Sequence, residues 1–413
     1  MKSEIITIGD ELLIGQVINT NQVYIAEKLN EVGVHVERMT TVGDEPQEIL
    51  DAFGEAWRRT DLVIVTGGLG PTHDDITKKA VCKFFECDLV TDSNVRRQIE
   101  SLLQKRNMGW TAAAEEQTMV PRKAKVILNP VGTAPGLLFE VDGKQFIVLP
   151  GVPYEMKEMM DQTVIPMIAS RGSGCIIRHL TLRTTGIPES MLAQRLGNLD
   201  EVLQGAKLAF LPSPTGVSLR ISVEDEEQSA AEQRVGAIEQ RIRAKVQKYI
   251  YGTGAEELEH ALGRILTERK LTLAVAESCT GGLISDRITN VSGSSAYFER
   301  GVIAYSNESK THLLGIPEHL IDTHGAVSRE VAEAMAEGIR RVAGTDIGLS
   351  TTGIAGPTGG TTEKPVGLVW IGYADPNGTV ALKLNLGDDR LRIKQRAAEA
   401  ALELVRRRLL KLE

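Results

Sequence analysis

Small residues that could hold a nucleophile follow an apolar run in the C-terminal third of the chain. The run 271–276 reads as a strand, Glu277-Ser278-Cys279-Thr280-Gly281-Gly282 follows it, and 283–289 has the pattern of a helix. A strand, a tight turn and a helix would place Ser278 at the carboxyl edge of a sheet, where α/β proteins usually carry their sites. The amides of Thr280, Gly281 and Gly282 would then face an anion or an oxyanion at a helix N-terminus. The alternative is that Ser278 and Thr280 only cap the helix.

A serine needs a base before it can act as a nucleophile, and Lys310 is the candidate for this role. The chain has no G-x-S-x-G elbow, and its seven histidines form no triad pattern. A lysine held partly out of water can lose its proton and serve instead. Read alone, Lys310 could equally be a solvated lysine at the start of a helix.

A glycine-rich segment at 350–360 supplies a third set of candidate residues. It follows an apparent strand, and its glycines would let the backbone approach a ligand closely. Thr352 and the amide of Gly353 could bind a carbonyl or a phosphate there. The segment matches neither a P-loop nor a dinucleotide fingerprint, and it could also be a mobile loop. Arg390, Arg392 and Arg396, in a late charged stretch, are candidate phosphate partners, although solvated helix faces look the same.

Together, these segments resemble the C-terminal domain of the CinA family. The resemblance rests on ESCTGG at 277–282, on the stretch from Gly293-Ser-Ser to Lys310, and on TGIAGP at 352–357. It implies a nicotinamide mononucleotide deamidase, which converts the carboxamide to a carboxylate and releases ammonia. It also implies that Ser278 attacks the amide carbon, that Lys310 handles the proton and that Tyr305 helps to position them. No cofactor is expected at this site.

A second candidate site lies near the start of the chain and has the composition of a phosphate and metal site. Gly67, Gly68, Gly70 and Thr72 follow an apolar run at 61–66, and glycine-rich turns of this kind let amides face an anion. Asp74 and Asp75 come next and could hold a divalent cation. Asp10 and Glu11 follow the first apparent strand and are supporting candidates. An aspartate beside a helix start is, however, very often only an N-cap.

The front segment resembles the molybdopterin-binding-like domain of CinA proteins. The residues that carry this resemblance are Gly9-Asp-Glu, Thr66-Gly-Gly-Leu-Gly-Pro with Asp74 and Asp75, Gly132-Thr-Ala-Pro-Gly and Leu149-Pro-Gly-Val-Pro. It implies a metal-dependent ADP-ribose pyrophosphatase, with the identity of the divalent cation left open. Two alternatives stay open: a module that binds molybdopterin, and a non-catalytic partner protein in competence or DNA damage.

The elements that must position these residues indicate a multidomain α/β protein. Short β-branched runs alternate with amphipathic stretches in the front segment, and Asp142-Gly143 adds a hairpin turn signal. We expect an α/β/α molybdopterin-binding-like domain at 1–170, a small α+β linker module at 178–253 and an α/β/α amidohydrolase domain at 254–413. The last domain is read as a second βα series, with a strand at 302–305 that ends on Tyr305.

Composition narrows the class of partners. The formal charge of −8 and the 4% aromatic content argue against direct nucleic-acid binding. No long apolar run indicates a membrane span, and the first residues lack the pattern of a secretory signal, so a cytoplasmic location is expected. The four cysteines lack metal-ligand spacing. Small nucleotides are therefore the expected partners, and a homodimer is the default assembly.

Overall fold

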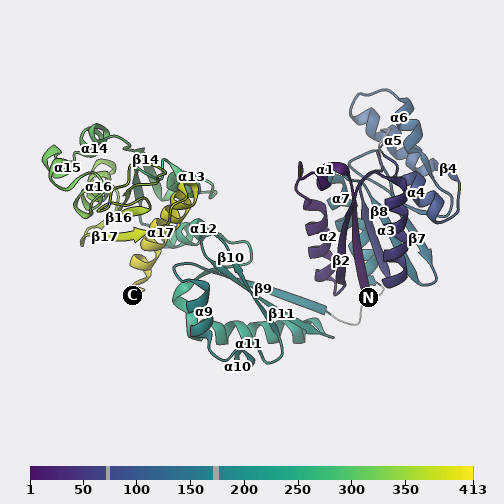
Figure 1. Cartoon of the computed structure of the whole chain (residues 1–413), viewed down its shortest axis with the longest axis horizontal. Coiled ribbons are helices and arrows are strands. Elements are labelled where there is room, and N and C mark those ends of the chain that lie inside the picture. The colour runs from purple at the N-terminus through teal and green to yellow at the C-terminus, as the bar shows by residue number, and fades with distance from the viewer. Residues whose placement is uncertain (71–74, 171–175, 413) are drawn as a thin grey trace. The chain divides into compact units, whose positions relative to one another are not determined.

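The computed structural model describes residues 1–70, 75–170 and 176–412, and Figure 1 shows the course of the chain. It divides into two compact units, the first formed mainly by residues 1–178 and the second mainly by 179–223 and 233–413. The middle module is thus grouped with the C-terminal domain. The three domain boundaries expected above stay a prediction.

A mixed sheet forms the centre of the first unit, with strand order β2-β1-β3-β8-β7-β6. Its strands are β1 (Lys2–Ile8), β2 (His35–Val42), β3 (Leu62–Thr66), β6 (Lys125–Ile127), β7 (Gly136–Val141) and β8 (Lys144–Leu149). The pairs among β2, β1, β3 and β8 are parallel, whereas β7 is antiparallel to β8 and β6. The expected hairpin turn at Asp142-Gly143 is confirmed.

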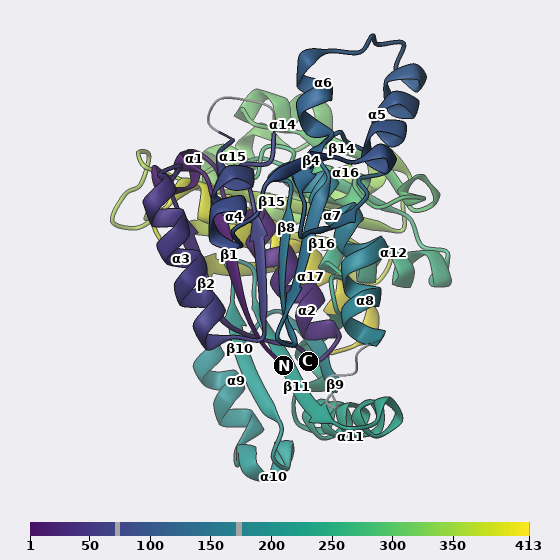
Figure 2. The same cartoon turned by 90° about the vertical axis from the view of Figure 1, so that its right-hand side faces the viewer.

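Helices cover both faces of this sheet because its central strands are apolar on both sides. In β3, Leu62 and Ile64 pack on the helix α2 side, whereas Val63 and Val65 pack on the α3 side. Figure 2 shows α5 and α6 together at one end of the unit. The remaining elements are α1 (Asp10–Leu13), α2 (Thr20–Glu31), α3 (Pro46–Arg59), α4 (Thr77–Phe84), β4 (Leu89–Thr91), α5 (Ser93–Lys105), α6 (Ala112–Gln117), β5 (Met119–Pro121), α7 (Pro153–Met159), the π-helical turn η1 (Met160–Val164) and α8 (Ile165–Ser170).

The middle module is a small α+β unit with a sheet of order β10-β11-β9-β12. Its elements are β9 (Ile176–Thr184), α9 (Glu189–Leu196), α10 (Leu199–Leu203), β10 (Lys207–Pro212), β11 (Val217–Asp225), α11 (Gln228–Val246), the 3-10 turn η2 (Gln247–Tyr249) and β12 (Ile250–Thr253). The expected α+β character of this module is confirmed, and its last strand, β12, has four residues and pairs antiparallel with β9.

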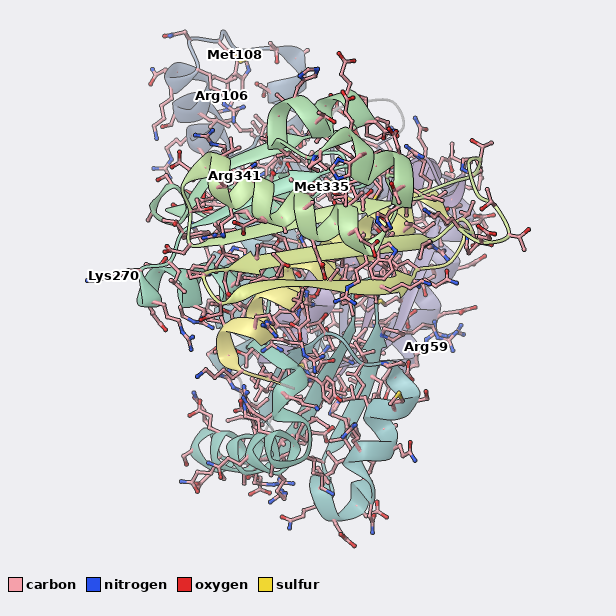
Figure 3. All side chains as sticks on the ribbon, turned by 90° about the vertical axis from the view of Figure 1, so that its left-hand side faces the viewer. Arg59, Arg106, Met108, Lys270, Met335 and Arg341 are labelled. Atoms are coloured by element: carbon pink, nitrogen blue, oxygen red, sulfur yellow. The ribbon has the colours of Figure 1, made fainter. Side chains whose placement is uncertain are left out.

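The C-terminal domain is a three-layer α/β/α structure around a sheet of order β14-β13-β15-β16-β17. Its elements are α12 (Leu258–Arg269), β13 (Leu273–Glu277), α13 (Leu283–Thr289), the 3-10 turn η3 (Ser294–Ala296), β14 (Phe298–Ile303), α14 (Asn307–Leu314), α15 (Glu318–His324), α16 (Arg329–Ala343), β15 (Ile347–Gly353), β16 (Leu368–Asp375), β17 (Gly378–Asn385) and α17 (Arg390–Leu410). Figure 3 shows α16 lying across one face of the sheet, where Met335 is fully buried, and α12, α13 and α17 pack on the other face.

Two details of this domain differ from the sequence expectation. The series is not βα to its end, because β16 and β17 form an antiparallel hairpin whose two-residue turn is Pro376-Asn377. The strand expected at 302–305 is β14, which begins at Phe298 and ends at Ile303. Tyr305 therefore lies in the loop before α14, and it is 61% exposed.

Candidate functional site

Ser278 and Lys310 lie in contact at the carboxyl edge of the C-terminal sheet. Ser278 directly follows β13, and its amide donates to Thr351 O on the neighbouring strand β15. Lys310 is in the first turns of α14, whose N-terminus is capped by Ser306. The Nζ atom of Lys310 lies 3.3 Å from Ser278 Oγ. The structure thus brings together a hydroxyl and an amine that are far apart in the sequence.

Burial makes the Lys310 amine better able to act as a base. Its side chain is almost fully buried, and burial lowers the pKa of the amine because the charged form loses its hydration. Nζ also donates to the carbonyl oxygens of Ala304 and Tyr305, at 3.0 and 3.2 Å. These two bonds hold the amine in place, and its remaining hydrogen-bonding position is directed to Ser278 Oγ. The solvated lysine of the alternative reading is therefore not what the structure shows.

A cavity of about 230 Å³ opens beside this pair. Its lining comprises Ser278, Cys279, Tyr305, Asn307, Lys310, Ala326, Val327, Thr352, Gly353, Ala355 and Arg390. Arg390 donates to Gly356 O at 2.6 Å, and its Nη2 lies 3.4 Å from the Tyr305 hydroxyl. A positive charge and a phenol thus face the serine in one cavity. Sequence reasoning did not single out Asn307, whose only signal was its place between Tyr305 and Lys310.

Of the arginines in the late charged stretch, only Arg390 is among the residues described as lining this cavity. Arg392 follows on α17, where its amide donates to the N-cap Asp389. Arg396 donates to Leu386 O at 3.1 Å and lines a different cavity. The structure therefore does not bring Arg392 and Arg396 to Ser278.

The turn after Ser278 is arranged differently from the expectation. Amides of Gly282, Ile284 and Ser285 at the start of α13 donate to the carboxylate of Glu277, at 2.9 to 3.1 Å. A buried side chain of the protein thus fills the anion position at this helix N-terminus, which leaves the Gly282 amide unavailable to a substrate oxyanion. Thr280 bonds to the Thr351 hydroxyl at 2.7 Å, so neither it nor Ser278 caps the helix. Gly281 and Gly282 adopt positive φ in this turn.

Thr352 and Gly353 lie on the opposite wall of the same cavity, at the end of β15. The Thr352 hydroxyl donates to Ala326 O at 2.7 Å, which ties the strand end to the loop before α16. The end of β15 therefore forms one wall of the cavity, called here the Gly353 wall.

The front unit carries a second cavity of about 370 Å³ at the carboxyl ends of β1, β3 and β8. Its lining comprises Ile8, Gly9, Glu11, Asp44, Gly67, Gly68, Leu69, Gly70, Asp75, Gln117, Thr133, Ala134, Pro150, Gly151, Val152 and Glu155. Gly67 has φ +118°, and a Cβ there would lie 2.2 Å from Ile8 O. Only glycine therefore allows β3 to turn so close to β1.

Most of the front residues chosen from the sequence meet in this cavity. Glu11 and Asp75 line it, as do Gly67, Gly68 and Gly70, whereas Asp10 is not among its lining residues. The side chain of Asp10 accepts from the amide of Asp44 instead, at 3.1 Å. Thr72 and Asp74 lie outside the described residues. The N-cap of α4 is Ile76, without a side-chain hydrogen bond, so Asp75 is not the N-cap of that helix.

Sequence reasoning missed three polar residues of the front cavity, Asp44, Gln117 and Glu155. Gln117 donates to Leu69 O at 3.0 Å, and Glu155 accepts from Asn129 Nδ2 at 2.7 Å. Both come from segments far from the glycine-rich turn, and only the fold brings them to it. Among the described residues, no group of three or more His, Cys, Asp or Glu is arranged to hold a metal ion.

The two sites define the class of protein: an α/β chain with a serine–lysine pair in one domain and an acidic, glycine-lined cavity in another. Three family profiles match the chain along its length. They are a probable molybdopterin binding domain at residues 4–170, a damage-inducible protein CinA KH domain at 179–252 and the CinA C-terminal domain at 255–409.

Full-length relatives agree with these matches. A CinA-like protein of Kosmotoga olearia is 45% identical and covers 100% of both chains. A putative competence-damage inducible protein of Caldicellulosiruptor bescii is 44% identical over 99% of this chain and 100% of its own. The chain therefore belongs to the CinA family. A crystal structure of the protein CinA from Thermoplasma acidophilum, titled as of unknown function, is 37% identical over 40% of this chain and 97% of its own, with a TM-score of 0.37.

Among the helices in the described ranges of the chain, none has both the length and the apolar character that crossing a bilayer requires.

Proposed function

We propose that the C-terminal domain hydrolyses the carboxamide of nicotinamide mononucleotide to the carboxylate, with release of ammonia. The observation that supports this proposal is the contact between Ser278 Oγ and the buried amine of Lys310. A neutral lysine beside a serine hydroxyl is a recognised arrangement for acyl transfer. The family resemblance supplies the identity of the amide.

The proposed reaction runs in two halves through an acyl-enzyme. Ser278 Oγ forms a bond to the carboxamide carbon while Lys310 Nζ takes the hydroxyl proton. The tetrahedral intermediate then collapses, the C–N bond breaks, and Lys310 returns the proton to the leaving ammonia. A water molecule next adds to the ester carbon, Lys310 accepts its proton, and the C–O bond to Ser278 breaks. The proton on Lys310 returns to Ser278, and the carboxylic acid releases its remaining proton to the solvent and leaves as the carboxylate.

Other cavity residues have roles in binding rather than in bond making. Arg390 is proposed to bind the 5′-phosphate. Among the described residues that line the cavity it is the one arginine, and guanidinium groups form charge-assisted hydrogen bonds with phosphate. Tyr305, in hydrogen-bond reach of Arg390, is proposed to keep that guanidinium in position. Contacts to the developing oxyanion are placed on the Gly353 wall, opposite Ser278.

The test is ammonia release from nicotinamide mononucleotide by the full chain, compared with Ser278→Ala and Lys310→Ala. Both variants should lose about 10³-fold or more of kcat, because each removes a group that reacts. Ser309→Ala is the matched control, since Ser309 lies one residue before Lys310 and its side chain bonds to the Ser306 hydroxyl rather than to Lys310 or Ser278. Circular dichroism confirms that each variant is folded. Wild-type protein that releases no ammonia would contradict the proposal.

For the front domain, we propose a metal-dependent ADP-ribose pyrophosphatase. The cavity at the ends of β1, β3 and β8 supports this proposal because it combines a glycine-lined turn with the carboxylates Glu11 and Asp75. Carboxylate oxygens are the ligands that hard divalent cations prefer, and these two side chains would hold the cation. When bound, such a cation would neutralise charge on the pyrophosphate. The amides of Gly67 and Gly68 would orient a phosphate group.

A molybdopterin ligand is the second candidate for this cavity, and the match to a probable molybdopterin binding domain favours it. Glycine-rich turns contact phosphate, which the two ligands share. Calorimetric titration of the full chain with ADP-ribose and, separately, with molybdopterin distinguishes them. Tighter binding of ADP-ribose, with cleavage on addition of Mg²⁺, is expected. Tighter binding of the pterin without any cleavage would favour the second candidate.

A further inference from the structure

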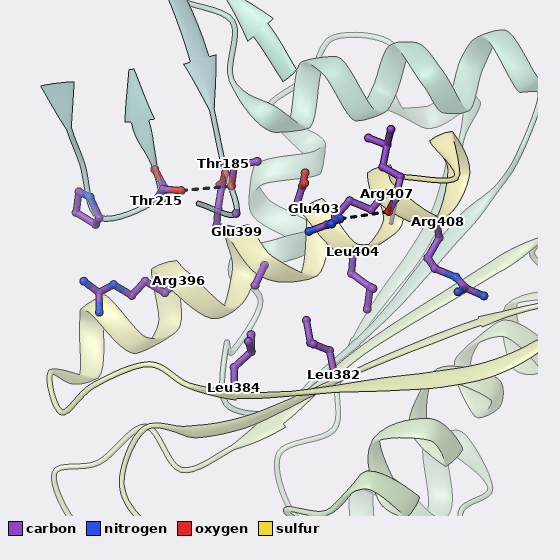
Figure 4. Close-up of a pocket in the computed structure, with 14 residues that line it drawn as sticks. Thr185, Thr215, Leu382, Leu384, Arg396, Glu399, Glu403, Leu404, Arg407 and Arg408 are labelled. Carbon is purple, nitrogen blue, oxygen red and sulfur yellow. Dashed lines mark hydrogen bonds between the residues drawn. The ribbon is translucent and has the colours of Figure 1, made fainter. Parts of the chain in front are cut away.

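A cavity of about 480 Å³ lies between the middle module and the C-terminal domain, within the second compact unit. Figure 4 shows it in close-up. Its walls are the loop at Thr185-Gly186, the loop at Pro214-Thr215, strand β17 and helix α17. Its volume falls within the range of about 300 to 1,000 Å³ that is usual for small-molecule sites. None of its lining residues belongs to the cavity beside Ser278.

One side of this cavity is apolar. Leu382 and Leu384 come from β17, which lies at the edge of the C-terminal sheet. Leu404 and Ala400 come from α17, and Figure 4 shows Leu404 above the two strand leucines. Leu382 remains 38% exposed. Covering such a surface with an apolar group would release water and favour binding.

Arginines surround this apolar surface without acidic partners. Arg396 and Arg407 each donate to a carbonyl oxygen, Leu386 O at 3.1 Å and Leu412 O at 3.4 Å. The guanidinium of Arg408 lies 5.6 Å from the centroid of the Tyr373 ring. Within the described part of the chain, none of the three forms an ion pair.

The acidic residues of the cavity have other partners. Glu399 pairs with Arg287 at 2.8 Å, and Glu403 pairs with Arg406 at 2.6 Å. Both carboxylates are thus held in largely buried ion pairs, and Arg287 also pairs with Glu259 at 2.6 Å. The charge that remains toward the cavity is therefore positive, from the three arginines. Guanidinium groups with spare N–H donors bind carboxylate, sulfonate and phosphate groups.

We propose that this cavity is a binding site for a small organic anion with an apolar body. The apolar part would lie against Leu382, Leu384 and Leu404. The anionic group would bind one guanidinium at an end of the cavity, that of Arg396 or that of Arg408, since the two lie about 18 Å apart along α17. The loops at Thr185-Gly186 and Pro214-Thr215 supply the middle-module side of the cavity. The proposal does not depend on the reaction assigned to Ser278.

The test uses 8-anilinonaphthalene-1-sulfonate, an aromatic anion whose fluorescence rises in apolar sites, titrated into the full chain. The double variant Arg396→Gln/Arg408→Gln should bind the dye about tenfold more weakly, because it loses the partners of the sulfonate. The matched control is Arg300→Gln/Arg329→Gln, which removes the same charge from residues outside the cavity. The control should bind as the wild type does.

A second variant, Ala400→Trp, places a large side chain in the cavity and should reduce dye binding without changing the charge. Circular dichroism and thermal unfolding identify any variant that fails to fold. Exposed apolar residues of the front unit, such as Ile14 and Ile18, could also bind the dye, but these substitutions would not alter that signal. Equal affinity in the wild type, the double variant and Ala400→Trp would overturn the proposal. Dye binding that weakens as protein concentration rises would also overturn it, since a second copy of the chain would then cover the site.

Discussion

The chemistry proposed for Lys310 depends on its protonation state, and this makes a prediction about pH. Only the neutral amine can accept the Ser278 proton, and burial lowers the pKa of Lys310 below that of an exposed lysine. As pH rises toward that pKa, the neutral fraction grows. We expect log kcat/KM for ammonia release to rise with pH by about one unit per pH unit and then to level off below the pH where an exposed lysine titrates. Steady-state rates across the pH range of the folded protein measure this.

The variant Lys310→Arg provides the control for the pH prediction. A guanidinium keeps its proton at every accessible pH, so this variant should be inactive across the whole profile. A wild-type profile that stays flat through the alkaline range would assign the base to another group.

The arginines of α17 allow a second prediction at the residue scale. Arg390→Ala should raise KM for nicotinamide mononucleotide about 10- to 100-fold, because it removes a charge-assisted contact to the phosphate. The riboside, which lacks the phosphate, should be processed equally by the wild type and the variant. Arg392→Ala should change neither the KM for nicotinamide mononucleotide nor the rate with the riboside, since Arg392 does not line the cavity. Equal losses with both substrates would mean that Arg390 acts only by holding Gly356 in place.

At the residue scale, the sequence indicated which residues are candidates for chemistry, but it did not indicate which residues they contact. Ser278 and Lys310 could be chosen because each follows a strand pattern and has a chemical role. Their distance could not be predicted, because it depends on β13, β14 and α14 packing together. The role of Glu277 shows the same limit: the helix N-terminus was predicted, but the carboxylate that fills it became visible only from the hydrogen bonds.

The start of α13 carries a prediction at the scale of the element. Glu277 is fully buried and accepts from three amides and from the Ser285 hydroxyl. In Glu277→Gln, an amide NH₂ would face donors, and the negative charge at the helix N-terminus would be lost. We expect the free energy of unfolding to fall by about 2 to 4 kcal/mol. Urea denaturation measures it.

Glu308→Gln is the matched control for this prediction, since Glu308 lies in the first turn of α14 but its side chain is 81% exposed. Its effect should stay within about 0.5 kcal/mol. If the two substitutions have similar effects, the bonds to Glu277 contribute little to the stability of the domain.

Elements with a clear period were predicted more accurately than short ones. Helix 283–289 was placed at the bounds that the structure gives, because its apolar spacing and flanking residues are distinct. The β16–β17 hairpin was read as part of a βα series, because its two-residue turn, Pro376-Asn377, is not one of the Asn-Gly or Asp-Gly pairs that mark such turns. β12 is too short to show a period, and its pairing with β9 comes from distant residues.

At the scale of the whole molecule, each proposed site is built by one compact unit. The front cavity is lined by residues 8–155, and the Ser278 cavity by residues 278–390. Each unit also has its own buried clusters, such as that of Phe53 in the first and that of Tyr373 in the second. A substitution in one cavity therefore leaves the packing around the other unchanged.

This separation predicts that the two activities can be removed one at a time. Ser278→Ala should abolish ammonia release and leave ADP-ribose cleavage at the wild-type rate, whereas Asp75→Asn should do the reverse, since Asp75 is a proposed cation ligand. A chelator should stop only the cleavage of ADP-ribose, because the serine–lysine reaction uses no metal. Assays of both products on the same preparations of the full chain measure this. Loss of both activities in either folded variant would show that the two sites depend on each other.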